Sequence, residues 1–153
     1  MRLFRFVLGK ELPKLRAEGV RVRIIGERGR FPADLRALMH KAETATAHLS
    51  GQTLAFALSY GGRAEILSAV NRAVEDGRAV DEASFGGLLW TAGLPDPDLI
   101  IRTGSEQRLS GFLPWQGVYS ELFFPQTYWP AFSREDFFSI LDEFSKRKRN
   151  FGK

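Results

Sequence analysis

Cysteine is absent from this sequence of 153 residues, histidine occurs only twice, and no long apolar run is present. Without cysteine the chain has no disulfide framework, no thiolate nucleophile and no cysteine-ligated zinc or iron–sulfur site. The two histidines, His40 and His48, are predicted to be surface residues of one helix. No apolar run reaches the roughly 18 residues of a membrane-spanning helix, and the first residues lack the uncharged core of a signal peptide. These absences predict a cytoplasmic protein.

The charge balance is mildly basic, with 22 Lys and Arg against 18 Asp and Glu and a net charge of +4. Such a balance suits an anionic partner, which could be nucleic acid, a membrane surface or a phosphorylated small molecule. The basic residues are dispersed, except in the run 146–149, and no RNA-binding or DNA-binding motif is present. Nucleic acid is therefore not expected as a partner.

Hydrophobic residues make up 44% of the chain, which is enough for one domain with a core. Short apolar segments predict four strands, and longer segments with apolar residues at helical spacing predict five helices. The strands are expected at 20–25, 53–58, 99–101 and 121–124, and the helices at 3–18, 32–49, 63–76, 81–90 and from 133 onward. Because helices separate the strands, we expect the α/β class, with a mostly parallel sheet flanked by helices and the four strands in one contiguous sheet.

Individual helices carry more specific expectations. Pro13 is expected to kink or split the first helix, and Gly19 to end it. Ser133 and Asp136 have the spacing of a capping box at the start of the last helix. The core face of the helix at 63–76 is expected to consist of Ile66, Leu67, Val70 and Val74.

Polar loops follow three of the predicted strands at their carboxyl ends, where parallel sheets bind their ligands. The loops are at 26–30, 59–63 and 102–110. The third holds two guanidiniums, a hydroxyl and backbone amides that Gly104 and Gly111 are expected to leave available, which together suit a diphosphate. Glu121 is the nearby acid suited to a divalent cation. Alternatively, the two arginines are surface ion-pair partners of Glu106 and Asp98.

The segment from Ile101 to Phe112, which reads Ile-Arg-Thr-Gly-x-Glu-x-Arg-Leu-Ser-x-Phe, is followed by Trp115 and by Tyr-Ser-Glu-Leu-Phe at 119–123. With this spacing the chain resembles the cis-prenyltransferases, in particular the bacterial undecaprenyl diphosphate synthases. Further matches lie at 21–26, 60–63, 129–130 and 151–152, so the resemblance covers essentially the whole chain.

The resemblance implies a transferase that condenses isopentenyl diphosphate onto an allylic diphosphate such as farnesyl diphosphate, with Mg²⁺, to give a Z-polyprenyl diphosphate for a lipid carrier. The positions that match the isopentenyl diphosphate site are Arg102, Arg108, Leu109 and Ser110. Glu121 matches an acid that helps to position Mg²⁺, across a dimer interface. The resemblance also implies a homodimer or a heteromer with another family member, and contact with a membrane surface through the product.

Two positions depart from the family pattern. Gln107 stands where some members carry a histidine that approaches the metal, and an amide is a poor Mg²⁺ ligand. The tail reads Asn-Phe-Gly at 150–152, where many members have Arg-x-Gly reaching the other subunit's substrate. Either Arg149 or Lys153 takes over that role, or the basic tail is simply solvated.

The front of the family pattern does not occur in this sequence. Members open with a strand followed by Met-Asp-Gly-Asn-Gly-Arg-Trp-Ala, which cradles the allylic diphosphate and Mg²⁺, and with a second strand that ends in a Ser-x-Glu-Asn-Trp-like segment. We therefore expect residues 1–153 to be a single domain, the C-terminal part of a cis-prenyltransferase domain missing the first two strands. Such a chain is expected to be inactive alone.

Two other interpretations remain open: a non-catalytic accessory subunit of a heteromeric enzyme, and a diphosphate-binding or nucleic-acid-binding module that has kept only the scaffold. The apolar segments 88–90 and 113–124 are expected either at a subunit interface or in the core. The helix at 3–15 is expected either to line a tunnel for the growing product or to pack as an ordinary core helix.

Overall fold

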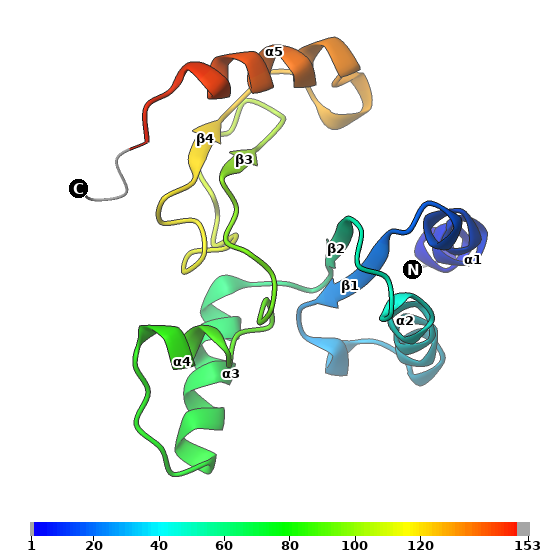
Figure 1. Ribbon diagram of the computed structural model, residues 1–153, viewed down its shortest axis with the longest axis vertical. Helices are drawn as coiled ribbons and strands as arrows, with labels where there is room; N and C mark the ends of the chain where they lie inside the picture. Colours follow the sequence, from blue (N-terminus) through cyan, green and yellow to red (C-terminus); the bar gives the residue numbers. More distant parts are fainter. Residues whose placement is uncertain (1, 150–153) are drawn as a thin grey trace. The chain divides into compact units, whose positions relative to one another are not determined.

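The computed structural model describes residues 2–149, apart from the side chains of residues 2–4, 7 and 8. Its helices and strands are α1 (Arg2–Ala17), β1 (Arg21–Ile25), α2 (Ala33–Thr46), β2 (Thr53–Ala57), α3 (Gly62–Glu75), α4 (Glu82–Gly86), β3 (Leu99–Ile101), β4 (Glu121–Phe123) and α5 (Arg134–Lys146) (Figure 1). The chain groups into two compact units, Met1–Ala92 and Gly93–Lys153, and a single domain stays a prediction. None of the described helices is long and apolar enough to cross a membrane.

The strands form two parallel pairs, which confirms the α/β class with parallel strands and flanking helices. In the first unit β1 pairs with β2, and in the second unit β3 pairs with β4. The expected contiguous sheet of four strands is not what the described residues form, because β2 and β3 share no ladder of hydrogen bonds. Four residues of β2 are exposed and one is half-buried, so helices do not cover this strand on both faces.

The core of the first unit lies between β1 and α2, with α1 beside them (Figure 1). Alternate residues of β1, Val22 and Ile24, meet Leu35 and Met39 of α2 there. Leu12 and Leu15 of α1 pack against this cluster, which favours ordinary packing for that helix. The segment 88–90 is also largely core, since Leu88 and Leu89 are buried.

The first helix runs from Arg2 to Ala17 without a break, so Pro13 does not split it. Its end is the one predicted. Gly19 has φ +74°, and the Val20 N–H donates to the Leu15 carbonyl at 2.8 Å while the Gly19 N–H donates to the Arg16 carbonyl at 3.1 Å. This pair of bonds satisfies the last helix carbonyls and turns the chain directly into β1.

Side chains of α2 cover the edge of β1 that does not face β2. The Val22 N–H donates to Thr46 Oγ1 at 3.0 Å, and the Ile24 N–H donates to Glu43 Oε1 at 2.9 Å. Arg28 closes the arrangement, donating to the Ile24 carbonyl at 2.7 Å and to both Glu43 oxygens at 2.7 Å. Backbone groups that a strand would otherwise pair are therefore satisfied by α2.

Replacing Thr46 by valine is expected to lower the free energy of unfolding by about 1–3 kcal/mol, because it leaves the buried Val22 N–H without an acceptor while keeping the side-chain shape. Thr46 is fully buried, and its hydroxyl also donates to the Ala42 carbonyl at 2.9 Å. Urea unfolding followed by circular dichroism measures the effect. Thr44→Val, at an exposed position of the same helix, is the control and should change little.

The face of α3 that packs inward is not the predicted one. Leu67, Val70 and Val74 are exposed, by 62%, 41% and 73%, and Ile66 is half-buried. The buried positions are instead Gly62, Glu65, Ala69 and Ala73. Glu65 sets this register, because its carboxylate accepts hydrogen bonds from the Tyr60 hydroxyl and, at 3.2 Å, from the Thr91 N–H.

The next helix is shorter than predicted. A capping box of Asp81 and Ser84 starts α4, with the Ser84 N–H donating to Asp81 Oδ1 at 2.8 Å. The helix ends at Gly86, and the chain continues in turns to Ala92. Two consecutive glycines at 86 and 87 account for the early end, because glycine loses more conformational entropy in a helix than other residues do.

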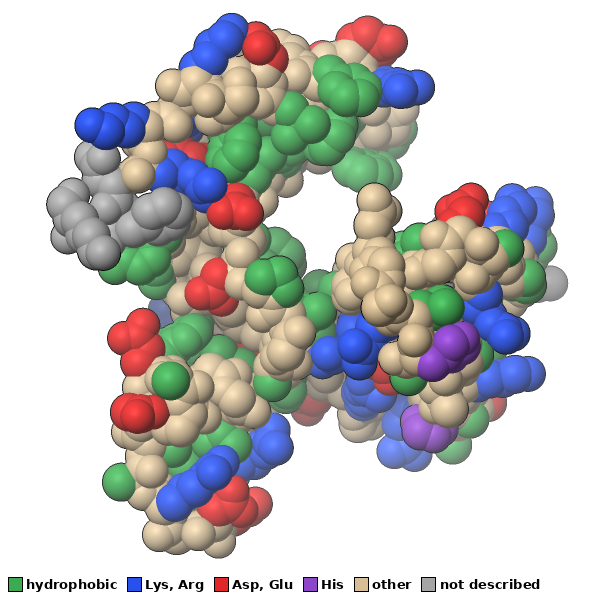
Figure 2. Space-filling model, in the orientation of Figure 1, with side chains coloured by type: hydrophobic (Ala, Val, Ile, Leu, Met, Phe, Trp, Pro, Cys, Tyr) green, Lys and Arg blue, Asp and Glu red, His purple; other side chains and the backbone are tan. Residues whose placement is uncertain are grey.

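The capping box predicted for α5 is confirmed. The Asp136 N–H donates to Ser133 Oγ at 3.0 Å, and the Ser133 N–H and hydroxyl both donate to Asp136 Oδ2 at 2.9 Å. None of the α5 residues, all of which are described, is fully buried, and Phe137 and Phe138 are 40% and 51% exposed. Figure 2 shows hydrophobic side chains gathered along one side of this helix.

The bonds from the Ser133 N–H and hydroxyl lower the pKa of Asp136 below its ordinary value of 3.8. Because the folded-state pKa is depressed, the cap contributes its full stability at pH values above the ordinary pKa of 3.8. This contribution is lost as the pH falls through the lowered pKa. A carboxyl ¹³C titration of Asp136 is expected to give a value under 3.8. In Ser133→Ala the value should return towards the ordinary one; no such return would contradict the assignment.

Candidate functional site

Arg102 lies at the carboxyl end of β3, one residue beyond the strand. Its N–H donates to the Phe123 carbonyl at 2.9 Å and so extends the β3–β4 pairing by one step. The register places Ile101 opposite Phe123 and Leu99 opposite Glu121. Arg102 is thus fixed at the strand end where a parallel sheet presents its ligand-binding loops.

The Arg102 side chain ties together the loop that follows it. Its Nη1 donates to Ser110 Oγ at 2.8 Å and also to the Arg108 carbonyl. The Arg102 side chain therefore links three of the four residues predicted for the diphosphate site. The contribution of Arg108 to this contact is its backbone, not its guanidinium.

The amides expected to be available in this loop are partly used. The Gly104 N–H lies 3.2 Å from the Pro125 carbonyl and 3.0 Å from the Thr127 carbonyl, and the Ser105 N–H lies 3.2 Å from the Pro125 carbonyl. These bonds join the loop after β3 to the loop after β4. The prediction that Gly104 frees amides for a ligand is wrong for these two groups, because the second loop satisfies them.

Non-glycine residues with positive φ mark the same loop. Ser105 has φ +63° and Ser110 has φ +49°, next to Gly104 at +95° and Gly111 at +79°. L-residues in this region cost roughly 1–3 kcal/mol and persist where the surrounding structure holds them. At Ser110 the Arg102 guanidinium provides such a hold, so the loop is shaped around that side chain.

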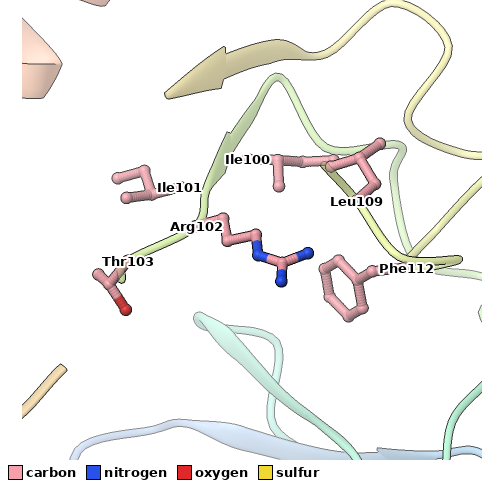
Figure 3. A pocket seen from close by; sticks show the side chains of 6 residues that line it. All are labelled: Ile100, Ile101, Arg102, Thr103, Leu109 and Phe112. Atoms are coloured by element: carbon pink, nitrogen blue, oxygen red, sulfur yellow. The ribbon is translucent and has the colours of Figure 1, made fainter. Parts of the chain in front are cut away.

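A cavity of about 320 Å³ opens beside Arg102, at the lower end of the roughly 300–1,000 Å³ of small-molecule sites. Its lining consists of Ile100, Ile101, Arg102, Thr103, Leu109 and Phe112. In Figure 3 the Arg102 guanidinium extends towards the Phe112 ring, and Ile100 and Leu109 lie together on the same side. The cavity thus offers one cationic group and an apolar wall.

The alternative interpretation of the two arginines holds in part. Arg108 Nη1 lies 2.5 Å from Glu106 Oε2, and both side chains are largely exposed. Asp98, in contrast, pairs with Arg149 and not with Arg102. Arg108 therefore has the surface ion pair that was the alternative expectation, whereas Arg102 does not.

Glu121, the predicted metal ligand, has a cationic partner in the structure. Its Oε2 accepts a hydrogen bond from Arg147 Nη1 at 2.7 Å, and Arg147 Nη2 donates to Glu143 Oε1 at 2.7 Å. The Arg147 guanidinium also lies 4.0 Å from the centroid of the Phe123 ring. Its hydrogen bond to Glu121, and then that to Glu143, raises the pKa of Arg147, so the guanidinium stays charged.

Glu121 and Arg102 are at opposite ends of the strand pair. Glu121 is the first residue of β4 and faces Leu99, three residues before Arg102. At about 3.3 Å per residue, this separation is roughly 10 Å along the strands. A carboxylate suits Mg²⁺, which often takes one or two protein oxygens together with phosphates. Among residues 2–149, however, no group of three His, Asp or Glu side chains is arranged around a metal site.

The remaining predicted positions are exposed or lie outside the described residues. Gln107 is exposed, and nothing in the described part of the chain makes it a ligand. His40 and His48 are exposed as predicted, but His48 lies just beyond the end of α2 and so does not share that helix. Both imidazoles are visible in Figure 2. The Asn-Phe-Gly tail and Lys153 lie outside the described residues.

Sequence reasoning missed three residues of this region. Phe112 and Thr103 line the cavity, and Arg147 bonds to Glu121, but the sequence patterns predict no role for these three residues. For Arg147 a signal existed, since Glu143 precedes it by four residues and such pairs meet on a helix. Its bond to Glu121 spans 26 residues and has no local signal.

The family model described as "Putative undecaprenyl diphosphate synthase" matches residues 1–152 of this chain. An isoprenyl transferase of Agrobacterium fabrum is 44% identical, over 99% of this chain and 64% of that protein. The ditrans,polycis-undecaprenyl-diphosphate synthase ((2E,6E)-farnesyl-diphosphate specific) of Xanthomonas axonopodis pv. citri is also 44% identical, over 99% and 62%. The chain therefore spans about three fifths of the length of these curated relatives.

Solved structures agree with the sequence relatives. A probable undecaprenyl diphosphate synthase of Campylobacter jejuni matches with a TM-score of 0.89 and 34% identity, over 99% of this chain and 72% of that one. Lavandulyl diphosphate synthase of Lavandula x intermedia, in complex with dimethylallyl diphosphate, matches with a TM-score of 0.92 and 32% identity, over 100% and 70%. Sequence and fold together show that this chain belongs to the cis-prenyltransferase family.

Proposed function

We propose that this chain carries the isopentenyl diphosphate site of a cis-prenyltransferase that makes a Z-polyprenyl diphosphate of the undecaprenyl type. The observation that carries the proposal is the Arg102 guanidinium in the wall of the cavity, joined to Ser110 Oγ at 2.8 Å. The names of the relatives support the class of reaction. The substrates and the activity of this chain are part of the proposal.

The contacts of Arg102 suit an exchange of partners when a diphosphate binds. A neutral hydroxyl and a carbonyl hold its Nη1 in the structure, and a phosphate oxygen is a stronger acceptor because it is charged. The Ser110 hydroxyl can accept from Arg102 and donate its own proton to the same ligand. The exposed Arg108 guanidinium also bonds to the diphosphate, after its ion pair with Glu106 breaks.

The apolar wall of the cavity suits the hydrocarbon part of the substrate. Ile100, Leu109 and Phe112 contribute aliphatic and aromatic surface on the side towards which Arg102 points. A small isoprenoid diphosphate has one apolar and one anionic end, and this cavity offers a matching partner to each. Simple phosphates would use only the cationic half of the site.

Mg²⁺ belongs to the proposal with Glu121 as the residue that would hold it. When bound, the ion supplies positive charge that stabilises the diphosphate as a leaving group. Glu121 lies at the other strand end from Arg102, so a cation there is not beside the cationic group of this cavity. This separation favours a second candidate function, that of a non-catalytic subunit supplying this site to a family partner. A homodimer or heteromer, a cytoplasmic location and contact with membranes through the product complete the proposal.

Chain elongation tests the proposal. Purified chain, farnesyl diphosphate, labelled isopentenyl diphosphate and Mg²⁺ are incubated, and label extracted into butanol is counted, with and without a full-length family member. We expect no product from the chain alone. We expect the wild-type chain to stimulate the full-length partner, and the Arg102→Ala variant not to do so. Product from the chain alone would show that it holds a complete active site. If neither mixture responds and isopentenyl diphosphate does not bind, the proposal is wrong.

A further inference from the structure

The apolar residues that line the cavity beside Arg102 differ in how much surface they leave for a ligand. Ile100 is only 7% exposed and belongs to the core. Leu109 is half-buried, whereas Phe112 is 39% exposed. The free energy of apolar burial follows the area removed from water. A bound hydrocarbon therefore gains most by covering the Phe112 ring.

The backbone around Phe112 is held in a conformation that L-residues rarely adopt. Ser110 has φ +49° and Leu113 has φ +47°, so left-handed residues lie on both sides of Phe112. The Phe112 N–H donates to the Leu109 carbonyl at 2.9 Å, and the Leu113 carbonyl accepts from the Gly117 N–H at 2.8 Å. For a bulky residue such as leucine this region is a genuine outlier, and such outliers cluster at binding sites. The strained turn is thus the feature that places Phe112 in the cavity wall.

The cationic group of the cavity determines where the hydrocarbon of a ligand begins. In Figure 3 the Arg102 guanidinium extends towards the Phe112 ring. A diphosphate that accepts hydrogen bonds from this guanidinium therefore has its first carbons beside the ring. The cavity volume of about 320 Å³ is at the lower end of the range for small-molecule sites, so it suits a short hydrocarbon.

We propose that Phe112 is a specificity-determining residue of this site, whose ring binds the first isoprenoid unit of a diphosphate ligand. The site then prefers isopentenyl diphosphate to methyl diphosphate, and it gains little from a second isoprenoid unit. The proposal rests on the proposed function for the class of ligand, and it adds the residue that selects the hydrocarbon part. Phe112 acts on binding only, because its side chain has no group that donates or accepts a proton.

A comparison of ligands with the same charged end tests this proposal on the full 153-residue chain. Isothermal titration calorimetry measures the affinities of methyl, isopentenyl and geranyl diphosphate for wild type, Phe112→Ala, Phe112→Leu and Phe137→Ala. Phe137→Ala is the matched control, because Phe137 is 40% exposed, lies on α5 of the same unit and does not line the cavity. The quantity compared is the ratio of the isopentenyl to the methyl diphosphate affinity, since damage to the loop would weaken both ligands.

The ratio is expected to be about ten or more in wild type, because four further carbons are covered in the isopentenyl ligand. It should fall to about one to three in Phe112→Ala, which removes the ring, and stay near the wild-type value in Phe112→Leu and Phe137→Ala. Geranyl diphosphate should bind wild type within about threefold of isopentenyl diphosphate, since its second unit extends beyond the cavity.

Two results overturn the proposal alone. One is a Phe112→Ala variant that keeps the wild-type ratio, even if both affinities fall together, because the ring would then support the loop and not select the hydrocarbon. The other is a wild-type chain that binds geranyl diphosphate about tenfold or more tightly than isopentenyl diphosphate. In both cases, binding that is lost in Arg102→Ala would leave the proposed function intact. If none of the ligands binds wild type, the proposed function and this inference are both wrong.

Discussion

Replacing Arg102 by alanine is expected to weaken isopentenyl diphosphate binding by about 10- to 150-fold. Each charge-assisted hydrogen bond is worth about 1.5–3 kcal/mol, and 1.4 kcal/mol is about a factor of ten. Loss of Arg102 also removes the group that holds Ser110 at its positive φ, so the loop loses its shape together with the charge. Isothermal titration calorimetry with isopentenyl diphosphate measures the change.

Two further variants separate charge from geometry at this position. Arg102→Lys keeps the charge but not the planar fork, so its binding should fall between wild type and Arg102→Ala. Arg78→Ala removes an exposed arginine that pairs with Asp76, far along the chain from the loop, and should bind like wild type. Equal affinities for wild type and Arg102→Ala would remove the main support for the proposed site.

Replacing Gly26 by alanine is expected to lower the free energy of unfolding by about 3–5 kcal/mol, through backbone strain and overpacking together. Gly26 follows β1 with φ +117°, and an added Cβ would lie 2.0 Å from the Leu58 carbonyl oxygen. That oxygen belongs to the backbone at the end of β2, which cannot move without disturbing the strand pair. The expected loss is a large part of the roughly 5–15 kcal/mol that stabilises a typical domain.

The control for this substitution lies three residues away. Gly29→Ala adds the same methyl group where nothing lies within 4 Å and where φ is not positive. Its unfolding free energy should stay close to the wild-type value or rise slightly, since alanine restricts the unfolded chain. Urea unfolding of both variants gives the comparison. Similar midpoints for the two would show that the β1–β2 junction tolerates a side chain.

Local patterns predicted the elements well where the local chain decides them. Gly19 ended α1 and the pair Ser133 and Asp136 began α5, because caps depend on residues within one turn. Arg102 and Ser110 could also be placed together from sequence, since they flank one short loop. In each case the deciding contacts span fewer than ten residues.

At the inward face of α3 and at Glu121, where local patterns failed, the deciding contacts include residues of other elements. The apolar spacing of α3 predicted Leu67 and Val74 as core, but burial of Glu65 by Tyr60 and Thr91 decides its inward face. The partner of Glu121 is likewise distant, because Arg147 follows the end of α5. No period or motif in either segment carries that information, because it is set by how separate elements pack.

Side chains of α2 occupy the outer edge of β1, so the backbone amides there are not open to another strand. Val22 and Ile24 donate to side chains there, so an incoming strand would have to displace Thr46 and Glu43 before it could pair. Another polypeptide, including an unfolded copy of this chain, therefore meets resistance at the β1 edge. Amide hydrogen exchange would reveal this cover, with Val22 and Ile24 exchanging as slowly as amides between two strands although no strand of residues 2–149 pairs with that edge.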